Sequence, residues 1–111
     1  MAGKVKALTV AMSSVLTTNI FNNASALIES YITKISIVNK TVSAATFSLW
    51  KGATGANAAG TEVFGGARSI AANGGYIEYS KLRMLSTDFL VGGAGTALAL
   101  TITIEYEEYA V

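Results

Sequence analysis

Residues 96–111 read TALALTITIEYEEYAV and alternate apolar and polar side chains almost to the end of the chain. Successive side chains of a strand point to opposite faces of its sheet, so an alternation with a period of two predicts a half-buried β-strand. The predicted inner face carries Leu98, Leu100, Ile102, Ile104 and Tyr106. The predicted outer face carries Ala99, Thr101, Thr103, Glu105 and Glu107. Another layer of structure has to cover the inner face.

Strand patterns recur along the rest of the chain, separated by clusters of glycine and asparagine, and no helical period of similar strength interrupts them. The predicted strands are residues 5–10, 15–21, 31–39, 45–51, 62–64, 68–71, 76–84 and 89–91, and the GGAG sequence at 92–95 is interpreted as a turn before the last strand. Eight or nine short strands in 111 residues predict an all-β fold, a single antiparallel β-sandwich.

A jelly roll and an immunoglobulin-like sandwich are the main alternatives for this sandwich. The immunoglobulin signature needs two cysteines, and the chain has none. Eight strands therefore favour the jelly roll. The single domain spans residues 1–111, and residues 1–30 could form an extended or docking segment at its N-terminal end.

The composition points to a partner. Hydrophobic residues make up 51% of the chain and charged residues only 14%, against roughly 25% charged residues in a typical domain. A partner that covers part of the surface would explain this shortage of charge. The eight basic residues are scattered, so we expect no nucleic-acid binding. Residues 89–104 are uncharged, but they are too short to span a membrane and are interrupted by GGAG, so we expect no membrane partner.

The chain offers little chemistry for catalysis. Without histidine and cysteine, Ser–His–Asp triads, Cys–His pairs and imidazole metal sites are excluded. Glu105 and Glu107 lie on one face of the last strand and could form a carboxylate dyad or a calcium site. A solvated strand face is the simpler interpretation of these two residues. We therefore expect no enzyme, no cofactor and no metal.

Trp50 is a candidate interaction residue. It alternates with Phe47 and Leu49, so it faces outward if those two residues lie in the core. Outward aromatic residues are favoured at protein interfaces and at sugar-binding platforms. A second apolar layer beneath a loop is the alternative environment for Trp50.

Three stretches resemble small virion proteins of tailed bacteriophages: TFSLWKGATGANAAGTEVF at 46–64, SIAANGGYIEYSKLR at 69–83 and TDFLVGGAGTALALTITIEYEE at 87–108. These proteins are the capsid decoration proteins, also called cement or staple proteins, and the chain is most similar to the staple proteins of epsilon-fifteen-like short-tailed phages. The resemblance extends over roughly residues 31–108 and lies in the pattern of strand and turn residues rather than in a chemical motif. It implies a jelly-roll domain that binds the outside of an icosahedral shell and clamps neighbouring major capsid proteins.

The resemblance also implies the partners and the location. We expect the major capsid protein as partner, a homo-oligomer with a dimer favoured, and a place on the outer capsid surface of the virion after synthesis in the cytoplasm of a bacterial host. The family provides no residue-by-residue correspondence. Termini that would be loose unless docked, together with exposed apolar area, give the candidate contacts, which are Lys4, Val5, Lys6, Trp50, Tyr106, Tyr109 and Val111.

Two other classes of protein fit the same sequence. One is a receptor- or glycan-binding module of a phage fibre or tail, in which Trp50 and a tyrosine would stack on a sugar. The other is a structural subunit of the tail or of the head–tail junction.

Overall fold

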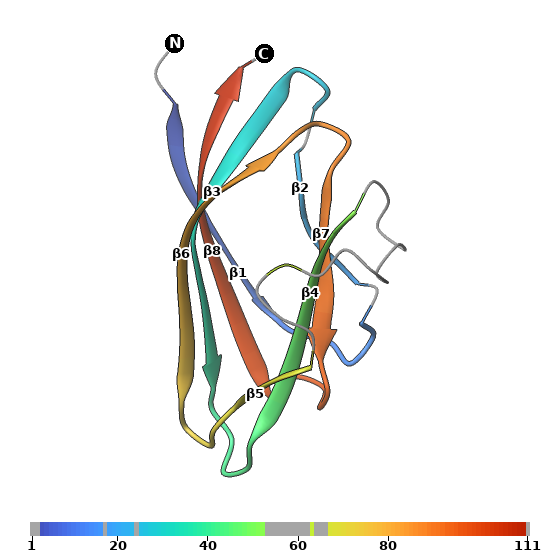
Figure 1. Ribbon diagram of the computed structural model, residues 1–111, viewed down its shortest axis with the longest axis vertical. Coiled ribbons are helices and arrows are strands. Elements are labelled where there is room, and N and C mark those ends of the chain that lie inside the picture. Colours follow the sequence, from blue (N-terminus) through green and yellow to red (C-terminus); the bar gives the residue numbers. More distant parts are fainter. Residues whose placement is uncertain (1–2, 17, 24, 53–62, 64–66, 111) are drawn as a thin grey trace.

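The computed structural model describes residues 3–16, 18–23, 25–52, 63 and 67–110. This part of the chain is all-β and forms two packed antiparallel sheets of four strands each (Figure 1). The strands are β1 (Lys4–Ala11), β2 (Asn19–Asn22), β3 (Ile28–Asn39), β4 (Ala45–Gly52), β5 (Arg68–Ile70), β6 (Gly75–Met84), β7 (Phe89–Ala94) and β8 (Leu100–Ala110). None of the described residues forms a helix with the length and apolar character to cross a membrane.

The strand order is that of a jelly roll. One sheet has the order β1-β8-β3-β6, here called the β8 sheet, and the other has the order β2-β7-β4-β5, here called the β7 sheet. β1 pairs with β8, β2 with β7, β3 with β6 and β4 with β5, so the chain forms one long antiparallel ribbon. The pairs β3–β8 and β4–β7 close this ribbon into a roll. The predicted all-β sandwich is confirmed, and its strand order is the predicted jelly roll.

The core lies between the two sheets and is built by the predicted alternation. On the β8 sheet, Ile35 is opposite Ile104 and Ile37 is opposite Ile102, and all four are fully buried. The β7 sheet contributes several large buried side chains to the same cluster: Phe47, Leu49, Ile70 and Leu90. Burial of these aliphatic and aromatic side chains is the main source of stability in such a sandwich.

The inner face of the last strand begins two residues later than its sequence pattern indicates. Leu98 was expected on the inner face, but it is exposed, has a positive φ of 60° and precedes β8. The chain crosses here from the β7 sheet to the β8 sheet. The backbone N–H of Leu98 donates to the carbonyl of Met12 at 2.9 Å, which fixes the crossing against the end of β1.

The GGAG sequence was interpreted as a turn, and this interpretation is wrong for Gly92, Gly93 and Ala94, which belong to β7. Both glycines lie where neighbouring backbone is too close for a side chain. A Cβ on Gly92 would lie 2.1 Å from the carbonyl oxygen of Ser48 in β4. A Cβ on Gly93 would lie 2.6 Å from the carbonyl oxygen of Ser13, which passes over the outer side of the sheet. The glycines are therefore required by packing rather than by a turn.

The two strands described within residues 1–30, β1 and β2, belong to the sandwich rather than to a separate segment. β1 is a full member of the β8 sheet, and β2 is a full member of the β7 sheet. The predicted strand at 15–21 is reduced to β2, which begins at Asn19. Most of the predicted strand at 62–64 lies outside the described residues.

Buried asparagines connect loops at both ends of the roll. Asn39 is fully buried, and its side-chain N–H groups donate to the carbonyls of Ser43 (2.9 Å), Ile70 (3.1 Å) and Ala71 (3.2 Å). The side-chain oxygen Oδ1 of Asn39 accepts a hydrogen bond from the backbone N–H of Thr41 at 2.9 Å. One side chain thus joins the β3–β4 turn to the segment between β5 and β6.

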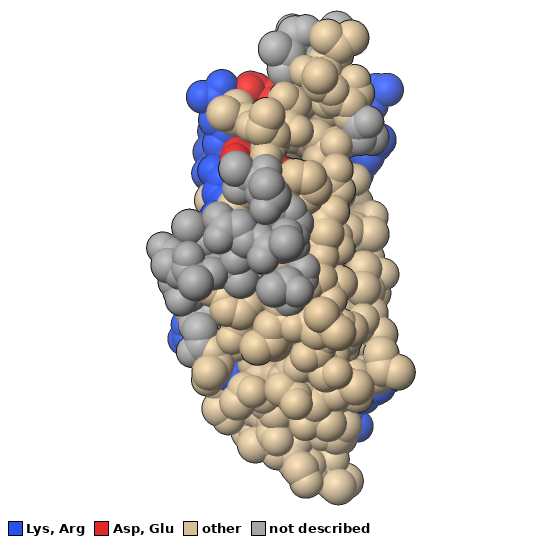
Figure 2. Space-filling model, turned by 90° about the vertical axis from the view of Figure 1, so that its right-hand side faces the viewer, with Lys and Arg blue, Asp and Glu red and all other residues tan. Residues whose placement is uncertain are grey.

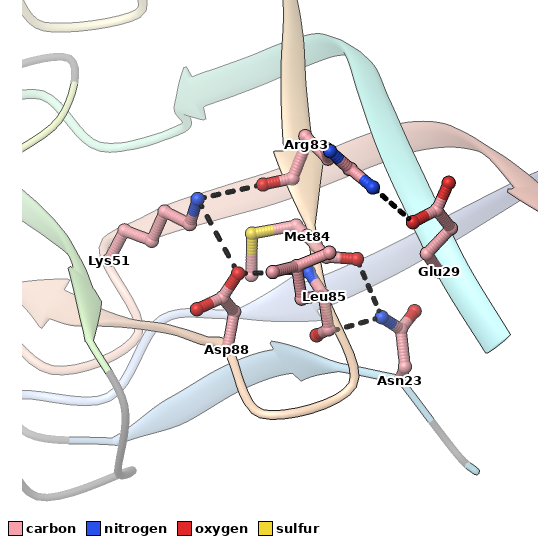
Figure 3. A network of polar contacts seen from close by, with 7 residues as sticks. All are labelled: Asn23, Glu29, Lys51, Arg83, Met84, Leu85 and Asp88. Atoms are coloured by element: carbon pink, nitrogen blue, oxygen red, sulfur yellow. Dashed lines mark hydrogen bonds and ion pairs between the residues drawn. The ribbon is translucent and has the colours of Figure 1, made fainter. Parts of the chain in front are cut away.

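At the opposite end, Asn23 is buried and donates to the carbonyls of Met84 (2.8 Å) and Leu85 (3.1 Å), as Figure 3 shows. The turn after β6 is also held by Asp88, which accepts from the Leu85 N–H at 2.9 Å and forms an ion pair with Lys51 at 3.5 Å. Because buried carbonyls need partners, replacing either asparagine with an apolar residue would leave several of them unsatisfied.

We expect Gly92→Ala to lower the free energy of unfolding by about 1–3 kcal/mol or more, because its Cβ would collide with rigid backbone of β4. Gly75→Ala is the matched control, since a Cβ there meets only the Ile37 carbonyl at an ordinary 3.5 Å. Urea denaturation of both variants tests this account. Equal stability of the two variants would contradict it.

Candidate interaction surface

The outer face of the β8 sheet divides into a charged half and an uncharged half. In the charged half, Lys34 pairs with Glu105 at 3.5 Å and Arg83 pairs with Glu29 at 2.9 Å, the latter seen in Figure 3. The bond to Glu29 raises the pKa of Arg83 above its usual value, so this side chain stays charged. Exposed ion pairs of this kind contribute little stability.

A tyrosine cluster occupies the same half, near the two termini. The rings of Tyr31 and Tyr109 meet edge to face with centroids 5.7 Å apart, and the Lys81 ammonium lies 5.5 Å from the Tyr31 centroid. The Tyr109 hydroxyl donates to a carboxylate oxygen of Glu107 at 2.6 Å. This hydrogen bond is the main reason why the pKa of Tyr109 is raised above its ordinary value near 10.

Glu105 and Glu107, considered above as a carboxylate pair, each have a partner of their own. Glu105 pairs with Lys34, and Glu107 accepts from Tyr109. Both side chains lie on the outer face, opposite Ala7 and Val5 of β1. The arrangement corresponds to the polar face of a strand with local cross-strand partners.

The uncharged half lies at the opposite end of the same face. It consists of Thr9, Ala11, Ser36, Val38, Gly75, Ile77, Thr101 and Thr103. Val38 is 49% exposed and Ile77 is 55% exposed, and they lie diagonally across the β3–β6 pair. The hydroxyls of Thr9 and Thr103 bond to each other at 3.1 Å, which leaves a face without a charged side chain.

The outer side of the β7 sheet is covered in part by its own chain. Ser13 and Val15 cross over Gly93, and the Ser13 carbonyl accepts from the N–H of Ala94 at 2.9 Å. Figure 2 views the molecule from this side, and in the lower half of the view charged residues appear only at the margins. Val15 is 60% exposed on this side of the molecule.

Trp50 was a candidate contact because an exposed side chain was one of its two predicted environments, and the exposed environment is wrong. It lies on the outer side of β4 and pairs with Val91, but only 9% of it is exposed. It also lies outside the central core cluster, so the alternative of a second apolar layer describes its environment. Its ring N–H has no hydrogen-bond partner among the described residues.

The remaining candidate contacts fall at the end of the sandwich where β1 begins and β8 ends (Figure 1). Lys4, Val5 and Lys6 are exposed on the edge strand β1, and Lys6 pairs with Glu108 at 3.1 Å. Val5 is 77% exposed. Tyr109 belongs to the tyrosine cluster.

Two of the candidates are not placed as surface contacts. Tyr106 packs against the core and meets Phe21 edge to face at 4.7 Å, so it is not an outward contact. Val111 lies outside the described residues.

The sequence analysis missed the uncharged half because its residues are Thr, Ser, Ala, Val, Ile and Gly, which form no recognisable motif. A signal was present in Thr101 and Thr103, which were assigned to the outer face. The cross-strand neighbours of these residues become known only with the register, which sets Thr101 opposite Val38 and Ala11, and Thr103 opposite Ser36 and Thr9.

Comparisons with known proteins add a weak structural likeness to this description. No family model matches the chain. No curated protein matches it in sequence. A chain in the structure of infectious bursal disease virus, Gx strain, is similar over 96% of this chain with a TM-score of 0.38 and 8% identity, and the match covers 38% of that chain. This is too little to transfer a function, so the resemblance to phage decoration proteins stays a prediction.

The pKa of Tyr109 tests the geometry of the tyrosine cluster. We expect Glu107→Ala to lower this pKa toward 10, because the hydrogen bond that stabilises the protonated phenol is lost. A tyrosine with a raised pKa in the folded state stabilises the fold below its ordinary pKa, and this contribution is lost as pH rises through the raised value.

Carbon-13 NMR of the labelled tyrosine rings would follow the titration. Glu105→Ala is the control, since Glu105 pairs with Lys34 rather than with Tyr109. An unchanged pKa of Tyr109 in Glu107→Ala would show that the bond to Glu107 does not form in solution.

Proposed function

We propose that this protein is a non-enzymatic structural component of a virion that binds the outer surface of an icosahedral capsid and clamps neighbouring major capsid proteins. The observation that carries the proposal is the uncharged half of the β8 sheet, in which Val38 and Ile77 are half-exposed and no side chain is charged. The resemblance of residues 31–108 to phage decoration proteins supplies the identity of the partner.

The uncharged half is suited to burial against another protein. The cores of protein interfaces are depleted in charged residues, because removing a charge from water is unfavourable unless it is paired. Thr9, Ser36, Thr101 and Thr103 can exchange bonds to water for bonds to a partner, while Val38 and Ile77 supply apolar area. The charged half beside it would form a polar rim.

The rest of the fold supports a mechanical role. A clamp has to keep its shape while the surfaces under it are under load. The jelly roll offers two sheets around a continuous core, and Asn23 and Asn39 bond the loops at its two ends. The contact face is built on strands, which hold side chains more rigidly than loops do.

The glycan-binding alternative has lost its main candidate residue. Trp50 is buried and therefore cannot stack on a sugar. This alternative and that of a tail subunit remain as outcomes of the test below.

The test is co-sedimentation of the purified protein with capsids stripped of accessory proteins. We expect saturable binding at a fixed ratio to the major capsid protein and a gain in the heat resistance of the shell. Ile77→Lys should weaken binding by about tenfold or more, because it buries an unpaired charge in the contact. Val15→Lys is the matched control, an exposed aliphatic residue between β1 and β2 on the outer side of the β7 sheet, and should bind as the wild type does.

Absence of saturable binding would overturn the proposal. Binding of glycans by the isolated protein, or its assembly into rings or tubes, would then favour one of the alternatives. Equal loss of binding in both lysine variants would move the contact away from the uncharged half.

A further inference from the structure

The four edge strands of the sandwich differ in how well they are protected from pairing with another chain. β5 has three residues, and β2 has four residues with a shifted register against β7. β6 is longer, but its pairing with β3 shifts between Ile32 and Lys34, and it carries Lys81 and Arg83 on its outer face. Short strands, irregular pairing and charges are the devices that prevent edge-to-edge association.

β1 is the least protected of the four, although it carries the exposed Lys4 and Lys6 at its start. Its eight residues pair with β8 in an unbroken register from Lys4 opposite Glu108 to Ala11 opposite Thr101. No described strand pairs with its other edge. The strand contains no proline, and no bulge interrupts its pairing with β8. A long, regular and open edge of this kind is a template for another strand.

The hydrogen bonds show which groups this edge offers. The N–H of Met12 donates to the carbonyl of Leu100 at 2.9 Å, in line with the register of the preceding pairs. Backbone groups of an antiparallel strand alternate between its two neighbours, so the even-numbered residues of β1 bond to β8. Val5, Ala7 and Thr9 therefore direct their N–H and carbonyl groups toward the open edge.

We infer that the open edge of β1 pairs with β1 of a second copy of this chain, forming a two-fold symmetric dimer in which two β8 sheets become one continuous sheet. An antiparallel pair of identical strands is self-complementary, because residue i meets residue j and residue j meets residue i. The bonding groups of Val5, Ala7 and Thr9 then meet the same groups of the second copy.

The two lysines of β1 limit the register. Like charges directly opposite each other are unfavourable, which disfavours registers that set Lys4 or Lys6 against Lys4 or Lys6 of the second copy. The registers that avoid this and keep most of the strand paired place Ala7 opposite Ala7 or Leu8 opposite Leu8. Both registers match outer face with outer face, and both place Ala7 beside the two-fold axis. Both also cover Val5, which is 77% exposed in the single chain.

The dimer would not depend on a shell, so its test is separate from that of the proposed function. Sedimentation-velocity analysis at micromolar concentration should give the wild type about twice the 11.5 kDa mass of the chain. Ala7→Lys and Ala7→Glu should each raise the dissociation constant by at least about tenfold, because each places two like charges beside the axis. An equimolar mixture of the two variants should form the dimer again, since opposite charges then meet.

Ile77→Lys is the matched control, because it introduces the same charge on the same face but on β6, the opposite edge strand. Its dimer should have the same dissociation constant as the wild type. Two results would overturn the inference: a monomeric wild type, and charged Ala7 variants that dimerise as tightly as the wild type. Variants of Ala7 that remain monomeric when mixed would also contradict it. Hydrogen exchange distinguishes one further outcome. If the N–H groups of Val5, Ala7 and Thr9 are protected only when the protein is bound to capsids, the open edge of β1 pairs with a strand of the shell and not with a second copy.

Discussion

The structure depends on the position of β8 between β1 and β3. This strand bonds along nearly its whole length on both sides, with Ile102 and Ile104 in the core and Thr101 and Thr103 on the outer face. Because the last strand of the chain is central in its sheet, the roll closes only when the C-terminal residues have joined the N-terminal ones. The same constraint explains why β8 stays paired up to Ala110, since residues near the end of a chain are ordered when they are held in a sheet.

Much of the architecture could be predicted because it depends on the spacing of apolar residues along each strand and on the turn residues that separate the strands. The alternation in 100–106 and the glycine and asparagine clusters gave the strands, and their number favoured the jelly roll. The predictions were wrong where the packing of segments distant in the sequence determines the conformation or the burial of a residue. Leu98 continues the apolar pattern but lies in the crossing between sheets. Gly92 lies in β7 rather than in a turn, at a position where the Ser48 carbonyl leaves no room for a side chain. Trp50 faces away from the core as predicted but is nevertheless buried.

The functional surface was harder to predict than the fold, since its residues have no distinctive chemistry. Threonine, serine and alanine at outer positions are typical of many sheets, and only the register groups them with Val38 and Ile77. The low charge of the chain, 14% of residues, indicated that such a face should exist without locating it. The candidate contacts near the termini were chosen as segments that would be loose unless docked, but β1 holds residues 4–11 in the sheet and β8 holds residues 100–110 there.

The two proposals fit together geometrically. Pairing through β1 about an axis perpendicular to the sheet would place the outer faces of both copies on the same side. Each dimer would then present two uncharged halves to one surface, which is the arrangement a clamp between neighbouring capsid proteins requires.

The most direct measurement is an electron cryo-microscopy reconstruction of shells saturated with the protein. It should show the sandwich on the outer surface, astride a boundary between capsid proteins, with the β8 sheet facing the shell. Density that contacts the shell through the β7 sheet, or no ordered density, would contradict this account.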